Sequence, residues 1–188
     1  MSLLAETLVD EWLNRKGFFT VRGIKDGVDE IDLLGVRQTK NGLEGWHVEA
    51  QVSFRPVSYI TKLTDGLAQK YGKKKTTAWE RPADVLKECV QAWVEKKFTC
   101  KKKVGTREKA WPRISWQLYL VHGVVKYQSE LVEIEQRGIK LVPFYQVLGD
   151  ICENVDDGFP GAAGSDIADI VGYYESFENV PKSKVVLP

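Results

Sequence analysis

The stretch His47–Phe54, HVEAQVSF, constrains the fold more than any other part of this chain. Side chains of a strand point alternately to its two sides, and this stretch divides cleanly under that rule. One side is apolar and the other polar, with Val48, Ala50, Val52 and Phe54 on the first and His47, Glu49, Gln51 and Ser53 on the second. We therefore expect a strand with one face on a core and a row of polar groups on the other.

The length of the chain, 188 residues with 43% hydrophobic content, suits a single well-cored domain. We assign the core domain to residues 1–150 and treat residues 151–188 as an acidic C-terminal extension. No early apolar stretch has the flanks of a signal peptide, and no apolar run approaches the roughly 20 residues that cross a bilayer. The sequence therefore predicts a soluble, cytoplasmic protein without membrane contact.

Cysteine and histidine are too few and too scattered for several kinds of site. The cysteines Cys89, Cys100 and Cys152 are odd in number and show no CxxC spacing, which argues against a disulfide framework and a structural zinc site. The histidines are His47 and His122. Carboxylates must therefore do most of any catalytic work.

The net charge of +1 hides an uneven distribution. Residues 141–181 contain no Lys or Arg, whereas two stretches are strongly basic. The first basic cluster comprises Lys70, Lys73, Lys74 and Lys75, and the second comprises Lys96, Lys97, Lys101, Lys102, Lys103, Arg107 and Lys109. Such clusters suit a polyanion with a regularly charged backbone; the alternative is two solvated loops. We expect nucleic-acid contacts from Lys70, Lys73, Lys74, Lys75, Lys101, Lys102 and Lys103, with Trp79 and Trp111 beside them to stack on bases.

Hydrophobic periodicity predicts a mixed α/β fold with a central sheet flanked by helices. An N-terminal helix over 2–16 is followed by three strands, and Asn41-Gly42 marks a tight hairpin between the second and third. Helices are predicted at about 59–72, 82–98, 128–138 and 164–177, strands at 18–24, 30–37, 46–54 and 114–125, and a short strand running into a helix at 139–151.

Asp32 is a carboxylate between hydrophobic neighbours on the second predicted strand. Burying an unpaired carboxylate is costly, so Asp32 either pairs with Arg22 or Arg37 or binds a cation. If the second and third strands form a hairpin, Asp32 comes close to Glu49, and two such carboxylates repel unless a positive charge lies between them. Mg²⁺ is the natural candidate because it prefers oxygen ligands and commonly uses one or two carboxylates.

These residues together resemble the PD-(D/E)xK nuclease superfamily. The resemblance rests on Asp32, the hairpin, the EAQ motif at Glu49–Gln51 and a preceding helix that contains Glu6. It covers roughly Leu3 to Val125, where the order helix, strand, strand, strand, helix, strand matches the family core. The resemblance implies a restriction-endonuclease-like core with a central mixed β-sheet flanked by helices.

Two positions depart from the family pattern: Ile31 stands where Pro often precedes the first acid, and Gln51 stands where Lys is usual. Some restriction enzymes of the superfamily have this E-x-Q form. The resemblance implies that Asp32 and Glu49 hold Mg²⁺ or Mn²⁺, that the Ala50 carbonyl adds a ligand, and that Gln51 orients the attacking water. Glu6 would join the metal shell, although a helix-surface role is the alternative, and Lys62 or Lys70 would replace the missing ammonium.

We therefore expect a metal-dependent DNA endonuclease that hydrolyses phosphodiester bonds, with DNA as its partner. The rival interpretation is a noncatalytic nucleic-acid-binding or assembly protein with a degenerate nuclease fold. A homodimer is left open, since cutting both strands at one place would favour paired sites. His47 shares the polar face with Glu49, and we expect it to be an exposed strand histidine.

Overall fold

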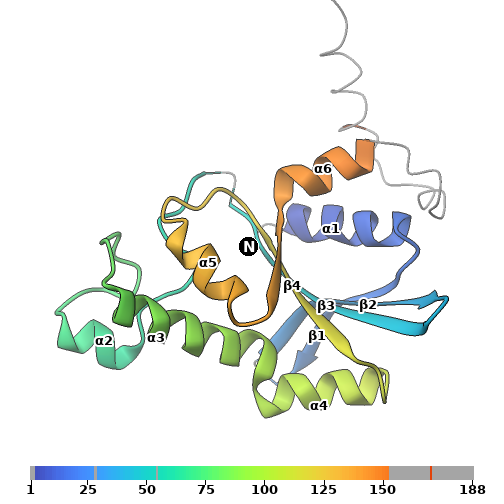
Figure 1. Cartoon of the computed structure of the whole chain (residues 1–188), viewed down its shortest axis with the longest axis horizontal. Coiled ribbons are helices and arrows are strands. Elements are labelled where there is room, and N and C mark those ends of the chain that lie inside the picture. Colours follow the sequence, from blue (N-terminus) through green and yellow to red (C-terminus); the bar gives the residue numbers. More distant parts are fainter. Residues whose placement is uncertain (1–2, 28, 54, 153–169, 171–188) are drawn as a thin grey trace, which may run out of the picture.

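The computed structural model describes residues 3–27, 29–53, 55–152 and 170. It shows a mixed α/β fold in which helices flank one five-stranded sheet (Figure 1). The elements in chain order are α1 (Leu3–Arg15), β1 (Phe19–Asp26), β2 (Asp29–Thr39), β3 (Gly42–Gln51), α2 (Asp65–Lys70), α3 (Ala83–Val94), the π-helical turn η1 (Glu95–Thr99), α4 (Lys101–Ala110), β4 (Trp116–His122), α5 (Ser129–Glu135), β5 (Ile139–Pro143) and α6 (Phe144–Cys152). The expectation of a central mixed sheet flanked by helices is confirmed.

The strand order across the sheet is β1-β2-β3-β4-β5, which is also the order along the chain. The first three strands form an antiparallel meander, with Leu33 opposite Val48 and Thr39 opposite Gly42. Gly42 has a φ of 109°, a left-handed value that glycine tolerates and that suits the predicted tight turn. Strands β4 and β5 then pair in parallel with β3 and with each other, so the carboxyl ends of these three strands share one edge.

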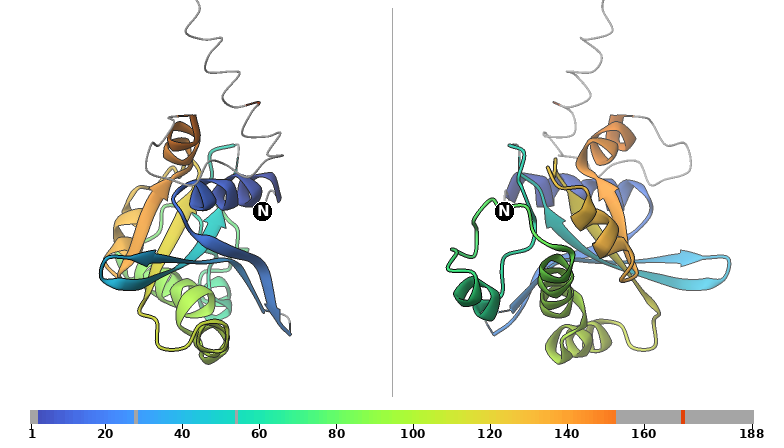
Figure 2. Two further views of the ribbon diagram at one scale, coloured as in Figure 1. Left: turned by 90° about the vertical axis from the view of Figure 1, so that its right-hand side faces the viewer. Right: turned by 60° about the vertical axis from the view of Figure 1, so that its left-hand side comes forward.

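Each face of the sheet carries its own layer of helices. Helices α1 and α6 lie side by side over one face and α3 and α4 cover the other (Figures 1 and 2). The apolar side of β3 packs under α1 and α6, where Val48 and Ala50 join Leu13 and Val147 in the larger core. On the opposite face Leu120 of β4 packs against Val90, Val94, Phe98 and Ile134.

Because helices cover both faces of the sheet, the polar side of β3 lies in the interior of the protein. His47 and Glu49 are each 0% exposed, so the expectation of an exposed strand histidine is wrong. The cause is the segment from η1 to α4, which lies over this part of the sheet and shields both side chains from water. The polar row of HVEAQVSF is therefore an interior surface.

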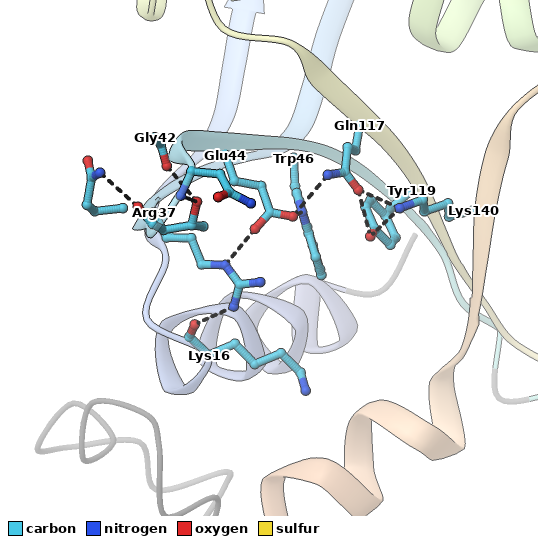
Figure 3. Close-up of polar contacts among 11 residues, drawn as sticks. Lys16, Arg37, Gly42, Glu44, Trp46, Gln117, Tyr119 and Lys140 are labelled. Carbon is cyan, nitrogen blue, oxygen red and sulfur yellow. Dashed lines mark hydrogen bonds and ion pairs between the residues drawn. The ribbon is translucent and has the colours of Figure 1, made fainter.

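A chain of polar contacts crosses the sheet on the α1 side (Figure 3). Arg37 of β2 donates to Glu44 of β3 at 2.8 Å, and Gln117 of β4 donates to the other oxygen of Glu44 at 3.0 Å. Lys140 of β5 donates to the Gln117 amide oxygen at 2.5 Å. Beside this chain the ring of Trp46 stacks on that of Tyr119. These contacts link four adjacent strands and favour one register.

Several sequence expectations differ from the observed elements. The helix expected over 59–72 is only the short α2, because its N-cap is Thr64, whose side chain accepts from the Leu67 amide. Helix α4 was not predicted, since its ten residues lack an apolar stripe. The expected helix over 164–177, and all but the first two residues of the acidic extension, fall outside the described residues apart from Ile170. Over the described ranges, every helix is too short or too polar to cross a membrane.

Candidate functional site

Asp32 and Glu49 come together on the face of the sheet that α3, η1 and α4 cover. The pairing of Leu33 with Val48 places Asp32 of β2 beside Glu49 of β3, one step further along the same register. Oδ2 of Asp32 accepts a hydrogen bond of 2.9 Å from the Ala50 amide. Asp32 is 2% exposed and Glu49 is 0% exposed. The expected meeting of two carboxylates from adjacent strands is therefore present, and we call them the acid pair.

Burial and mutual repulsion shift the titration of the acid pair. Burial, followed by the charge of Glu49, raises the pKa of Asp32 to about 7. Burial also raises the pKa of Glu49, although the neighbouring ammonium groups oppose the shift. The neighbouring Glu49 side chain also favours the protonated form of Asp32. The pair behaves as two carboxylates that resist ionising together in the absence of a further cation.

Lys97 of η1 supplies positive charge at the acid pair. Its Nζ donates to Oε2 of Glu49 and lies 3.8 Å from Oδ1 of Asp32. The two carboxylates hold the pKa of Lys97 above its ordinary value, although burial opposes them. Lys97 is therefore a fixed cation at this site. The proposed pairings of Asp32 with Arg22 or Arg37 are wrong, because Arg22 pairs with Asp10 and Arg37 with Glu44.

The position of Lys97 follows from the inner stripe of α3. Val90 and Val94 are buried on that stripe, and Lys97 follows them by seven and three residues. The π-helical turn, closed by the Cys100 amide donating to the Glu95 carbonyl at 2.8 Å, ends the helix there. Such turns widen a helix locally and are frequent at functional sites. Sequence reasoning missed Lys97 because it lies within a basic stretch, although continuing the stripe four residues beyond Trp93 reaches it.

Two basic residues of α4 complete the surroundings of Glu49. Lys103 is 3% exposed; its Nζ donates to the Glu30 carbonyl and lies 3.6 Å from Oε1 of Glu49. The sequence predicts a nucleic-acid contact from Lys103, but its ammonium is buried and held by these oxygens. Arg107 follows four residues later on the same face of α4 and is also buried.

His47 links Arg107 to Glu49, and the contacts determine its tautomer. Nη1 of Arg107 lies 2.7 Å from Nδ1 of His47, and Nε2 of His47 lies 3.1 Å from Oε1 of Glu49. A guanidinium only donates, so Nδ1 accepts and Nε2 carries the proton that is donated to Glu49. Burial, and then the charge of Arg107, depress the pKa of His47 well below its ordinary value. Neutral His47 thus holds Glu49 in one orientation.

Glu6 and Gln51 lie at the margin of the acid pair. Glu6 of α1 is half-buried, and burial followed by repulsion from Asp32 and Glu30 raises its pKa. It is therefore near enough to Asp32 to sense its charge. Gln51 is half-buried at the end of β3, where its carbonyl accepts from the Gly123 amide at 3.3 Å.

The other lysines that were expected to contact nucleic acid are either exposed or packed against an aromatic ring. Lys70, Lys74, Lys75, Lys101 and Lys102 are exposed. Lys73 is half-buried with its ammonium 4.9 Å from the centre of the Trp79 ring, and Trp79 packs against Tyr71. Trp111 is half-buried with its ring 6.1 Å from that of Trp116. The ammonium groups at the acid pair belong to Lys97 and Lys103, where Lys62 or Lys70 had been expected.

The oxygen donors of the acid pair fit a hard divalent cation. Asp32, Glu49 and the Ala50 carbonyl provide oxygens only, which is the ligand type that such a cation prefers. For a cation to bind there, the Lys97 ammonium would have to move away from Glu49. Within the part of the chain that the structure describes, no group of three or more His, Cys, Asp or Glu side chains is placed to hold a metal.

No protein-family model, no curated protein and no solved structure matches this chain.

Proposed function

We propose that this chain is a metal-dependent DNA endonuclease that hydrolyses phosphodiester bonds, with a restriction-endonuclease-like core. The observation that carries the proposal is the convergence of Asp32, Glu49 and Lys97 at one buried position. Further support comes from the antiparallel meander after an N-terminal helix and from the parallel fourth strand, as the resemblance to the PD-(D/E)xK superfamily implies.

Asp32, Glu49 and the Ala50 carbonyl would hold Mg²⁺ or Mn²⁺. When bound, the ion supplies charge neutralisation at the phosphoryl group and lowers the pKa of a water molecule. The charge of the ion would favour the ionised form of both carboxylates, because it would offset the burial and the repulsion from Glu49 that raise the pKa of Asp32. Glu6 extends this negative surface from α1.

Lys97 replaces the lysine that the PD-(D/E)xK superfamily usually has at the position of Gln51. Gln51 bears no charge and cannot act as a base, whereas Lys97 is held as a cation by its carboxylate neighbours. Moved from Glu49 onto a phosphoryl oxygen, its ammonium stabilises the negative charge that develops during in-line displacement. Gln51, at the end of the same strand as Glu49, orients the attacking water through its amide.

Lys103, Arg107 and His47 support the site without touching the substrate. His47 donates to Glu49, Arg107 fixes the tautomer of His47, and the Phe98 carbonyl accepts from Arg107 at 2.8 Å. This line of contacts keeps Glu49 oriented when Lys97 moves away. They are positioning residues rather than catalytic ones.

Plasmid nicking in the presence of Mg²⁺ tests the proposal. The unaltered protein converts supercoiled plasmid to the open circle, and Asp32→Ala and Glu49→Ala abolish the conversion while leaving DNA binding in EDTA intact. Glu135→Gln, an exposed acid on α5, serves as the matched control and keeps full activity. Absence of nicking with Mg²⁺ and with Mn²⁺ in the unaltered protein would reject the nuclease.

A noncatalytic DNA-binding protein is the second candidate, and one observation favours it. Both carboxylate oxygens of Glu49 already meet basic groups, Lys97 at one and His47 and Lys103 at the other. Such an arrangement is satisfied without a metal. DNA binding that is equally strong in EDTA and Mg²⁺, without any cleavage, would support this candidate.

A further inference from the structure

A second polar site lies between the end of β3 and α3, away from the acid pair. A pocket of about 280 Å³ is lined by parts of residues 57–62, by residues 76–78 and by Arg81. We call it the Arg81 pocket. Its lining contains the cations Lys62 and Arg81, the hydroxyl residues Ser58, Tyr59, Thr61, Thr76 and Thr77, and no carboxylate. This composition suits an anion.

Arg81 is buried with part of its hydrogen-bonding capacity in use. It is 7% exposed, and its Nη1 and Nη2 donate at 2.9 Å to the hydroxyl and carbonyl oxygens of Thr61. Its guanidinium carbon lies 3.9 Å from the centre of the Tyr59 ring. Over the described ranges, Nε is buried without a hydrogen-bond partner. Leaving such a donor unsatisfied is costly, and a ligand with acceptor oxygens would remove that cost.

A buried carboxylate behind the pocket holds the guanidinium in place. Glu130 of α5 is 0% exposed and accepts from the amides of Ile60 and Thr61 and from the Thr61 hydroxyl at 2.6–2.9 Å. The Thr61 hydroxyl thus stands between Arg81 and Glu130. Because Glu130 already accepts three hydrogen bonds, the arrangement orients Arg81 while leaving its Nε edge unused. Preorganised donors of this kind suit the recognition of phosphate.

The Arg81 pocket is continuous with the strand that carries Glu49. A smaller pocket of about 190 Å³ is lined by Gln51, Val52, Ser53, Val57, Tyr59 and Ile60. It shares Val57, Tyr59 and Ile60 with the Arg81 pocket. These shared residues therefore connect the end of β3 at Gln51 with the Arg81 pocket. The first basic cluster lies next to the same segment, since the Leu63 amide donates to the Lys75 carbonyl at 3.0 Å.

We propose that the Arg81 pocket binds a backbone phosphate of the nucleic-acid strand, at a position removed from the bond that is cut. The proposal rests on the nuclease function only in its choice of a nucleic acid as the source of the phosphate. Arg81, Lys62 and Thr77, which line the pocket, contact the phosphate oxygens. Such a contact carries no sequence information and fixes the register of the strand relative to the acid pair.

The salt dependence of DNA binding tests the proposal independently of cleavage. Binding to duplex and single-stranded oligonucleotides is measured in EDTA for the unaltered chain, for Lys62→Gln and for Thr77→Val. Lys62→Gln is expected to lower the slope of log affinity against log salt by about 0.9 for the duplex or about 0.7 for the single strand. Lys87→Gln, an exposed lysine of α3 outside the pocket, is the matched control and leaves the slope unchanged.

Inorganic phosphate serves as a second probe of the same pocket. In a ¹H–¹⁵N spectrum of the full chain, phosphate is expected to shift the Arg81 Nε–H resonance, and Thr77→Val raises the concentration needed. A phosphate shift together with an unchanged slope in Lys62→Gln would mean a site for small phosphate compounds and would overturn the strand contact. No shift and an unchanged slope would overturn the site altogether, even if nicking occurs. A lowered slope in a chain that never nicks DNA would support the contact and reject only the nuclease.

Discussion

Nζ of Lys97 lies 3.8 Å from Oδ1 of Asp32, although the two residues come from the end of a helix and from the second strand of the sheet. The same ammonium donates to Glu49, so one cation lies at both members of the acid pair. This relationship places a charged amine where the E-x-Q motif itself has none. It makes Lys97 the most informative residue to change.

Lys97→Met is expected to slow nicking strongly while keeping the fold. The substitution keeps an unbranched side chain but removes the ammonium to which we assign the stabilisation of transition-state charge, a loss of roughly 10²–10³-fold in rate. Single-turnover nicking with Mg²⁺ at saturating protein measures the effect, with circular dichroism to verify folding. Lys87→Met is the control and retains the full rate. Nicking by Lys97→Met at the rate of the unaltered chain would remove Lys97 from the chemistry.

The sequence predicts the acid pair because two short-range patterns specify it. The period of two in HVEAQVSF sets the face of Glu49, and the Asn41-Gly42 turn sets the pairing that brings Asp32 beside it. The position of Lys97 is harder to predict. The sequence shows that it continues the buried stripe of α3, but a lysine within a basic stretch is expected to be exposed to solvent. Lys103 carries no distinguishing signal among its lysine neighbours.

Helix α4 shows why part of the fold escapes periodicity. Its buried face consists of Lys103 and Arg107, whereas an amphipathic pattern assumes an apolar buried face. The buried cations are stabilised by Glu49, His47 and the Glu30 carbonyl. These partners lie more than 50 residues away in the sequence. Electrostatic complementarity between distant segments is invisible to a local window.

Asp32→Asn is expected to stabilise the fold at neutral to alkaline pH while abolishing nicking. The pKa of Asp32 is raised, so its protonated form favours folding; that contribution is full below about pH 4 and is lost as the pH rises through 7. Raising the pKa from 3.8 to about 7 corresponds to on the order of 4 kcal/mol. Urea denaturation between pH 4 and 8.5 measures the free energy of unfolding of both chains. The difference between the variant and the unaltered chain should increase up to pH 7 and then remain constant. Glu135→Gln is the control, and a gap that is constant with pH would contradict the shift.

The two histidines are expected to adopt opposite tautomers. In His47 the proton lies on Nε2, because Arg107 donates to Nδ1, and burial keeps the ring neutral. In His122, Nδ1 lies 2.8 Å from the Gly123 carbonyl, which only accepts, so Nδ1 carries a proton. Long-range ¹H–¹⁵N correlation spectra distinguish the forms. Because the pKa of His47 is lowered, its contribution to stability is present above pH 6.5 and declines as the pH falls; a doubly protonated His47 at pH 6 would refute the arrangement.

Glu6→Gln is expected to raise the Mg²⁺ concentration for half-maximal nicking by roughly tenfold, as loss of an outer ligand partner does in other metal sites. The reason is its location: the pKa of Glu6 is raised by burial and then by repulsion from Asp32 and Glu30, so its charge acts on the acid pair. DNA binding in EDTA should not change, since no phosphate contact is lost. Glu135→Gln again supplies the control. An unchanged Mg²⁺ requirement would leave Glu6 as a residue of the α1 surface and confine the metal ligands to the two strands.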